Sequence, residues 1–207
     1  LLALVLGMAL SAAGLVASTF HLGHPERAWR AFSQWRSSWL SREGVAATVT
    51  FLPALALGWI WLSGALPGRL WGLLLVIGCV VTVLCTAMIY ASLKPIARWH
   101  SPWVPASYLG FAASTGTAWL WLVLAATTAT PRVVPALVAA TALLAWAVKL
   151  AYWQRTDGPA APTPGSATGL GPGQVRLVEP PHVGQNYILR EMGFRVARKH
   201  AAKLRNI

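Results

Sequence analysis

Five apolar segments, each close to the length of a membrane-spanning helix, constrain the fold of this chain more than any other feature. A bilayer core of about 30 Å is crossed by about 20 apolar residues in a helix. The segments cover residues 1–20, 44–62, 70–92, 103–126 and 133–152. We therefore predict an all-α fold, a polytopic membrane helix bundle with five spans. It forms the domain 1–152, with the loop 21–43 between the first two spans.

The composition agrees with a chain that lies largely within a lipid bilayer. Hydrophobic residues make up 56% of the sequence and charged residues only 11%, too few to cover the surface of a soluble domain. The 12 tryptophans are typical of the aromatic belts at membrane interfaces. The net charge of +12 lies in the loops and the tail, not in a stripe along a soluble domain. We expect the lipid bilayer, and no nucleic acid, as a partner.

The last quarter of the chain differs in composition from the spans. Residues 153–187 are rich in proline and glycine and predict an extramembrane loop. Residues 188–207 are basic and predict an interfacial helix that leads to a further span. The chain begins inside an apolar run and stops on a basic segment, so we expect it to be a piece of a longer polypeptide.

The basic residues of the loops predict the orientation in the membrane. Because successive spans alternate in direction, loops 21–43 and 93–102 share one face with the tail. The opposite face carries only Arg69 and Arg132. By the positive-inside rule the basic face is cytoplasmic. The two loops supply six basic residues: Arg27, Arg30, Arg36, Arg42, Lys94 and Arg98.

Small residues recur at helical spacing in two spans. In the first span they predict a face to which a neighbouring backbone comes close, and in the fourth span a face that meets protein. The two sets are Gly7, Ser11, Gly14 and Ser18, and Ser107, Gly110, Ser114 and Thr117.

Several classes of membrane protein are disfavoured by what the spans lack. None of the five histidines falls inside a predicted span, so we expect no intramembrane bis-histidine haem. Cys79 and Cys85 share one span without a nearby histidine or acid, which predicts neither a metal site nor an iron–sulfur cluster. We place no Asp or Glu inside a span and find no inverted repeat. Both observations disfavour a transporter.

The loop 21–43 carries the candidate chemistry. His21 directly follows the first predicted helix and Glu43 directly precedes the second. Adjacent antiparallel helices would bring the two within about 10 Å, a helix-packing distance. An imidazole and a carboxylate at headgroup level can together accept the two protons of a quinol, and Trp29, Trp35 and Trp39 could flank its ring. Each residue taken singly also fits a helix cap, a headgroup anchor or a turn.

Three stretches resemble the DMSO reductase membrane anchor subunit (DmsC) family. Residues 17–44, ASTFHLGHPERAWRAFSQWRSSWLSREG, match its signature most closely. YASLKPIARWHSPWVPASYLG and MGFRVARKHAAKLR are also similar to parts of the family. The resemblance implies an eight-helix, haem-free anchor in the bacterial inner membrane, with one helix before this chain and two after it. It also implies partnership with a four-cluster iron–sulfur subunit and a molybdopterin catalytic subunit.

The resemblance also implies a reaction and the residues that carry it. The family oxidises menaquinol and passes the electrons to the clusters. Its quinol-site histidine and glutamate fall on His21 and Glu43, and its glycine and arginine on Gly23 and Arg27. An aromatic position falls on Trp29, where we expect Phe. The rival interpretation is a passive anchor that docks a soluble oxidoreductase without quinone chemistry. The substrate of the catalytic subunit and the direction of electron flow stay open.

Overall fold

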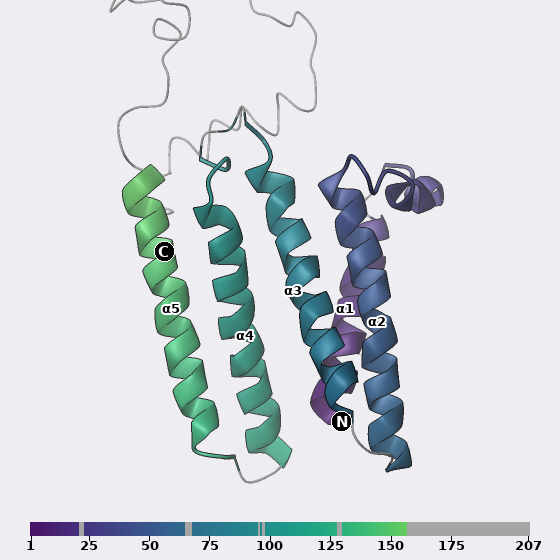
Figure 1. Cartoon of the computed structure of the whole chain (residues 1–207), viewed down its shortest axis with the longest axis vertical. Coiled ribbons are helices and arrows are strands. Elements are labelled where there is room, and N and C mark those ends of the chain that lie inside the picture. The colour runs from purple at the N-terminus through teal and green to yellow at the C-terminus, as the bar shows by residue number, and fades with distance from the viewer. Residues whose placement is uncertain (21–22, 65–67, 95, 97, 128–129, 157–207) are drawn as a thin grey trace, which may run out of the picture. The chain divides into compact units, whose positions relative to one another are not determined.

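Five long helices and one short 3₁₀ helix make up the part of the chain that the structure, a computed structural model, describes (Figure 1). The described residues are 1–20, 23–64, 68–94, 96, 98–127 and 130–156. His21, the predicted loop from residue 157 onward and the predicted helix 188–207 lie outside them. The elements are α1 (Leu2–Phe20), η1 (Pro25–Phe32), α2 (Trp39–Ser63), α3 (Arg69–Ala91), α4 (Trp103–Thr127) and α5 (Val133–Thr156).

All five α-helices are long and apolar enough to cross a membrane, which confirms the predicted all-α bundle of five spans. Many large apolar side chains point away from the bundle; Leu143 and Trp59, for example, are both 72% exposed. The buried positions are mostly small, such as Ala54, Ala87 and Ala145. This distribution suits a lipid environment, where close packing of small residues holds helices together and large apolar residues face the acyl chains.

Two helix pairs pack tightly through small and hydroxylated residues. Between α2 and α3, a Cβ added to Gly78 would lie only 2.5 Å from Thr50 Oγ1. Between α4 and α5, a Cβ on Gly110 would lie 3.3 Å from the Cα of Ala145. Thr117 Oγ1 is also 2.9 Å from Thr141 Oγ1 on α5. The prediction that this face of the fourth span meets protein is therefore confirmed.

Helix α1 packs differently, and the prediction for its small-residue face is wrong. A Cβ added to Gly7 or Gly14 would have no neighbouring atom within 4 Å. No Cα of α1 comes within 8 Å of a Cα of α3, and α1 has no buried residue. The glycines and serines of α1 thus face open space instead of a close neighbouring backbone.

Helix α2 begins earlier than predicted, at Trp39 instead of residue 44. Ser38 is its N-cap: the Ser38 hydroxyl accepts a hydrogen bond from the backbone N–H of Ser41, at 3.4 Å. Glu43 therefore lies inside α2 and does not precede it, so our placement of every acidic residue outside the spans is wrong. The last described helix also differs from its predicted range, because α5 continues through Thr156, past residue 152.

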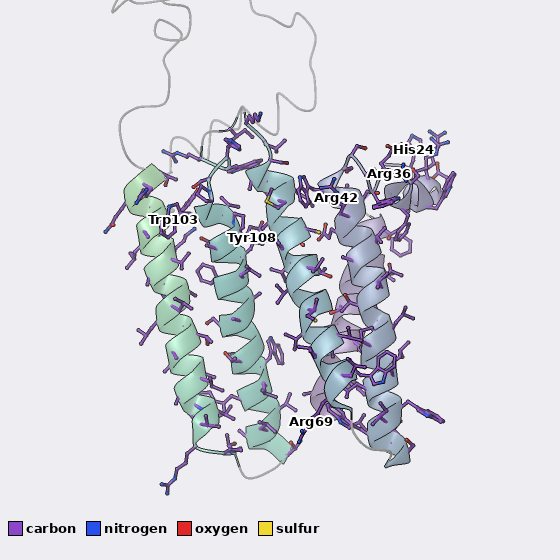
Figure 2. The ribbon with its side chains drawn as sticks, in the orientation of Figure 1. His24, Arg36, Arg42, Arg69, Trp103 and Tyr108 are labelled. Atoms are coloured by element: carbon purple, nitrogen blue, oxygen red, sulfur yellow. The ribbon has the colours of Figure 1, made fainter. Side chains whose placement is uncertain are left out.

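Most of the described basic residues gather at one end of the helices. Figure 2 places Arg36 and Arg42 at the end where α2 begins, and Arg69 at the opposite end, where α3 begins. Tyr152 Oη on α5 donates a 3.0 Å hydrogen bond to the carbonyl of Arg98, so the loop after α3 is held at the basic end as well. The charge asymmetry on which the predicted orientation depends is thus present in the fold.

Candidate functional site

A cavity of about 570 Å³ lies between α1, α2 and α3. One wall is the small-residue face of α1, where Gly7, Ser11, Gly14 and Ser18 leave room that larger side chains would fill. The α2 and α3 walls combine apolar groups with a few polar ones. They are formed by Glu43, Ala47, Thr50, Phe51, Ala54, Leu75, Cys79, Thr82 and Val83. The cavity is thus mostly apolar, with one carboxylate and several hydroxyls, which is the usual make-up of a small-molecule site.

Glu43 is the only ionisable carboxylate on this wall, and α3 holds it in place. Thr86 Oγ1 donates a hydrogen bond of 2.7 Å to Glu43 Oε1. Further along the same interface, Thr50 Oγ1 and Thr82 Oγ1 are 3.5 Å apart. These contacts form a polar ladder between α2 and α3, of which Glu43, Thr50 and Thr82 border the cavity. A carboxylate so placed can accept or donate a proton at the cavity wall.

The segment before α2 is docked on the start of that helix. Ser41 Oγ donates to the carbonyl of Ala31, and the Phe32 ring lies against Gly44. Arg42 Nε and Nη2 donate to the carbonyls of Trp35 and Arg36. The Arg42 guanidinium also lies 4.2 Å from the centre of the Trp39 ring. Residues 25–38 of the predicted interface loop are therefore a 3₁₀ helix followed by a turn, anchored beside Glu43.

Three other predicted site residues, all of them described, do not border the cavity. Gly23 is exposed with open space around it. Arg27 is exposed, and its Nε lies 3.7 Å from the Glu26 carboxylate. Trp29 is 65% exposed, with the Arg30 guanidinium 5.6 Å from its ring centre. The structure thus brings Glu43 to the cavity and leaves Gly23, Arg27 and Trp29 on the surface of the preceding segment. His21 lies outside the described residues.

Sequence reasoning missed the threonines that accompany Glu43. In the sequence these look like ordinary small residues of apolar spans. Each hydroxyl, of Thr50, Thr82 and Thr86, also donates a hydrogen bond to a backbone carbonyl of its own helix. The available signal was spacing: Thr82 and Thr86 are four residues apart and share one helix face. Only the α2–α3 contact shows that this face meets a carboxylate.

Metal ligands do not gather in the described part of the chain. There, no three side chains among His, Cys, Asp and Glu lie close enough together to hold a metal ion. Cys79 borders the cavity, whereas Cys85 is buried. The expected lack of a haem and an iron–sulfur cluster in this chain stays a prediction.

Comparison with known proteins gives a family and a relative. The family model described as DMSO reductase anchor subunit (DmsC) matches residues 1–155. A sulfite dehydrogenase subunit from Allochromatium vinosum is 41% identical over 117 residues, which cover 50% of this chain. The match spans 36% of the length of that relative, so this chain corresponds to only part of it. No solved structure matches.

Proposed function

The chain belongs to the DMSO reductase anchor subunit (DmsC) family, and on that premise we propose that it links a molybdopterin oxidoreductase to the quinone pool of the bacterial inner membrane. Its proposed partners are a four-cluster iron–sulfur subunit and a molybdopterin catalytic subunit. Its proposed substrate is a quinol, with menaquinol as the expected type. The apolar spans and the family support a membrane anchor.

One observation supports the quinol site above all others: the Glu43 carboxylate, bonded to Thr86 Oγ1 at 2.7 Å, borders an apolar cavity of about 570 Å³ between α1, α2 and α3. A quinol headgroup needs a hydrogen-bond partner where it leaves the hydrocarbon, and its apolar tail needs an apolar path. The cavity offers both, because Glu43 lies near the start of α2 while Ala3, Leu4 and Leu75 extend the wall along the spans.

The proposed reaction is the oxidation of quinol to quinone, which releases two protons and two electrons. Glu43 accepts one proton from a quinol hydroxyl. We propose His21, which follows the last residue of α1 in the sequence, as the acceptor of the other. The two electrons pass to the nearest cluster of the iron–sulfur partner. Gly23, Arg27 and Trp29 enter as proposed quinol contacts through the family resemblance alone, since none of them borders the cavity.

The proposed orientation has the basic end of the bundle at the cytoplasmic surface. Five described cationic residues lie at that end in the segment before α2 and in the loop after α3: Arg27, Arg30, Arg36, Lys94 and Arg98. Arg42 joins them at the start of α2. An excess of Lys and Arg beside the spans is typical of cytoplasmic loops.

A second candidate function is the passive anchor, and the surface of η1 favours it. Its arginines and Trp29 are exposed, and exposed Arg and Trp side chains are common at protein interfaces. A passive anchor has no need of a carboxylate on a cavity wall between spans, so Glu43 separates the two functions.

The test is Glu43→Gln in membranes that contain the assembled complex. We expect the rate at which menadiol reduces the partner's iron–sulfur clusters, followed by EPR, to fall by about 10²-fold or more, because general base catalysis contributes about 10²–10⁴-fold. Glu26→Gln is the matched control, since the Glu26 side chain is exposed and does not line the cavity that Glu43 borders. An unchanged rate in Glu43→Gln, or no cluster reduction by menadiol in the wild type, would favour the passive anchor.

A further inference from the structure

A second cavity, of about 430 Å³, lies between α3, α4 and α5. Its wall is mostly apolar and includes Val83 on α3 and Phe111 and Ala112 on α4. Among the described residues that line it, Lys149 on α5 is the only charged one. The volume lies in the range of about 300–1,000 Å³ that is usual for ligand sites. The cavity is therefore an apolar space between spans with one cation on its wall.

The Lys149 side chain extends toward the end of α5. Side chains on a helix normally lean toward its N-terminus. The Nζ of Lys149 instead lies 5.0 Å from the centre of the Tyr152 ring and 5.4 Å from that of the Trp153 ring, both of which follow it in the helix. The Cα of Lys149 is about 10 Å along the helix from the last residue of α5, Thr156. The ammonium thus extends from the apolar level of the span toward the headgroups, as lysines near the ends of spans do.

A second cation lies at the same end of α5. Arg155 is in the last turn of the helix, and its guanidinium lies 5.7 Å from the centre of the Trp103 ring at the start of α4. Figure 2 places Trp103 at the basic end of the bundle. Tyr152 Oη donates to the carbonyl of Arg98, which holds the loop after α3 at this end too. Two cations and several aromatic rings therefore surround the headgroup end of the second cavity.

No described carboxylate neutralises these two cations. The acidic residues that the structure describes are Glu26 and Glu43. The ion pairs in the described part of the chain all involve Glu26, so neither Lys149 nor Arg155 has a carboxylate within 4.0 Å there. A cation beside hydrocarbon is costly unless an anion or another polar group compensates it. The charge of this site is complementary to that of an anionic ligand.

We propose that an anionic phospholipid binds here, with one acyl chain in the cavity between α3, α4 and α5 and its phosphate at the Lys149 ammonium. Arg155 contributes a second positive charge to the headgroup. The apolar wall matches the acyl chain, and the cations match the phosphate. Basic pockets between spans are typical binding sites for the phosphate headgroups of anionic lipids. Aromatic rings at this level are typical of the membrane interface.

The depth of Lys149 favours a lipid over a soluble protein as the ligand. Its neighbours Trp146 and Leu150 on α5 are large apolar residues, 54% and 49% exposed, so this part of the helix lies among acyl chains. A soluble protein that docks on the basic end of the bundle does not reach this level. A phospholipid extends through it, from the headgroup at Arg155 to the acyl chain beside Phe111.

The test is photo-labelling of the purified assembled complex with a phosphatidylglycerol that carries a diazirine in one acyl chain. We expect the label on Phe111 or Ala112, which line the cavity. Unlabelled phosphatidylglycerol should compete with an IC50 at least tenfold lower than that of phosphatidylcholine with the same chains. Glycerol 1-phosphate should not compete, because it has no acyl chain. Equal competition by both lipids, effective competition by glycerol 1-phosphate, or a label confined to other helices would overturn the proposal.

Two pairs of variants test the two halves of the site. Lys149→Gln should raise the IC50 of phosphatidylglycerol about fivefold, the effect expected of one cation near a membrane surface, whereas Lys149→Arg should stay within twofold of the wild type. Thr115→Phe places a ring in the cavity and should lower the label at least fivefold, and Ala113→Phe, outside the wall, should not.

The same variants separate a lipid site from a protein-docking surface. Native mass spectrometry of each complex shows whether the iron–sulfur partner is still bound. We expect it to stay bound in Lys149→Gln. Loss of that partner in Lys149→Gln, with lipid competition unchanged, would identify a surface for a protein and overturn the lipid site. Arg132→Gln, in the turn before α5 at the opposite end of the bundle, is the charge-matched control and should bind the lipid as the wild type does.

Discussion

Arg42 Nη2 donates a 2.6 Å hydrogen bond to the backbone carbonyl of Arg36. The contact crosses from the start of α2 back to the turn that precedes the helix, and Arg42 Nε adds a second bond, of 2.9 Å, to the carbonyl of Trp35. One side chain thereby joins the 3₁₀ segment to the helix that holds Glu43. The position of the 3₁₀ segment beside the proposed quinol site therefore depends on the Arg42 guanidinium.

Loss of the Arg42 contacts should loosen the segment between α1 and α2. In Arg42→Gln we expect backbone amides between residues 25 and 38 to exchange with solvent about tenfold faster, because a hydrogen bond to a charged group contributes about 1.5–3 kcal/mol and these bonds are partly exposed to solvent. Hydrogen exchange followed by mass spectrometry measures this. Arg69→Gln, at the opposite end of the bundle, should leave the segment unchanged. Equal exchange in both variants would show that Arg42 does not hold it.

Filling the first cavity should block the proposed site without unfolding the chain. A Cβ at Gly14 meets no atom within 4 Å, so Gly14→Leu has room for its side chain, and that room is the cavity. We expect the Kd of a fluorescent quinol-site inhibitor for membranes with the complex to rise at least tenfold. Gly116→Leu, where the space is also open but outside the cavity, should bind as the wild type does. Equal Kd values for the two variants would place the inhibitor elsewhere.

The α4–α5 contact should be intolerant of added volume. A Cβ at Gly110 lies 3.3 Å from Ala145 Cα, so Gly110→Leu must push the helices apart, and overpacking typically costs about 1–3 kcal/mol. We expect a lower Tm in detergent than for Gly116→Leu, which gains the same side chain in open space. Differential scanning fluorimetry compares the two. Identical Tm values would mean that the close approach does not stabilise the pair.

The proposed orientation can be tested with one single cysteine in the segment before α2 and another at the last residue of α2. In a background with Cys79 and Cys85 replaced by alanine, Ser33→Cys marks the basic end and Ser63→Cys the other, since both serines are exposed. A membrane-impermeant thiol reagent should label Ser33→Cys only in inside-out vesicles and Ser63→Cys only in right-side-out vesicles. The reverse pattern would place the basic end outside the cytoplasm.

The helices could be predicted from the sequence because length and apolar content suffice to define a span. The start of α2 could not. Arg42 and Glu43 look like loop residues by charge, and α2 includes them because Ser38 caps the helix and because carbonyls and Thr86 compensate the two charges. The hydrogen bond from Arg42 to the carbonyl of Arg36 and the hydrogen bond from Thr86 to Glu43 both depend on how other parts of the chain fold. The spacing of residues in the sequence does not predict that.

The small-residue faces show the same limit. The faces of α1 and α4 have nearly the same pattern, yet Gly110 packs against Ala145 while Gly14 borders a cavity. The pattern states only that a neighbour can come close. Whether one does depends on the partner helix, and α5 offers Ala145 and Thr141 where α3 stays away from α1. For the candidate site, the sequence indicated Glu43, but the cavity and the contact with Thr86 could be identified only from the folded structure.

The most direct measurement is photo-labelling of the assembled complex with an azido-quinone, followed by mass spectrometry of the labelled peptides. If the quinol occupies the cavity at Glu43, the label should fall on its wall, on Ser11 or Ser18 of α1 and on Ala47 or Phe51 of α2. Excess menadiol should abolish that label. Competed labelling confined to α4 and α5, or to η1 alone, would contradict the cavity as the quinol site.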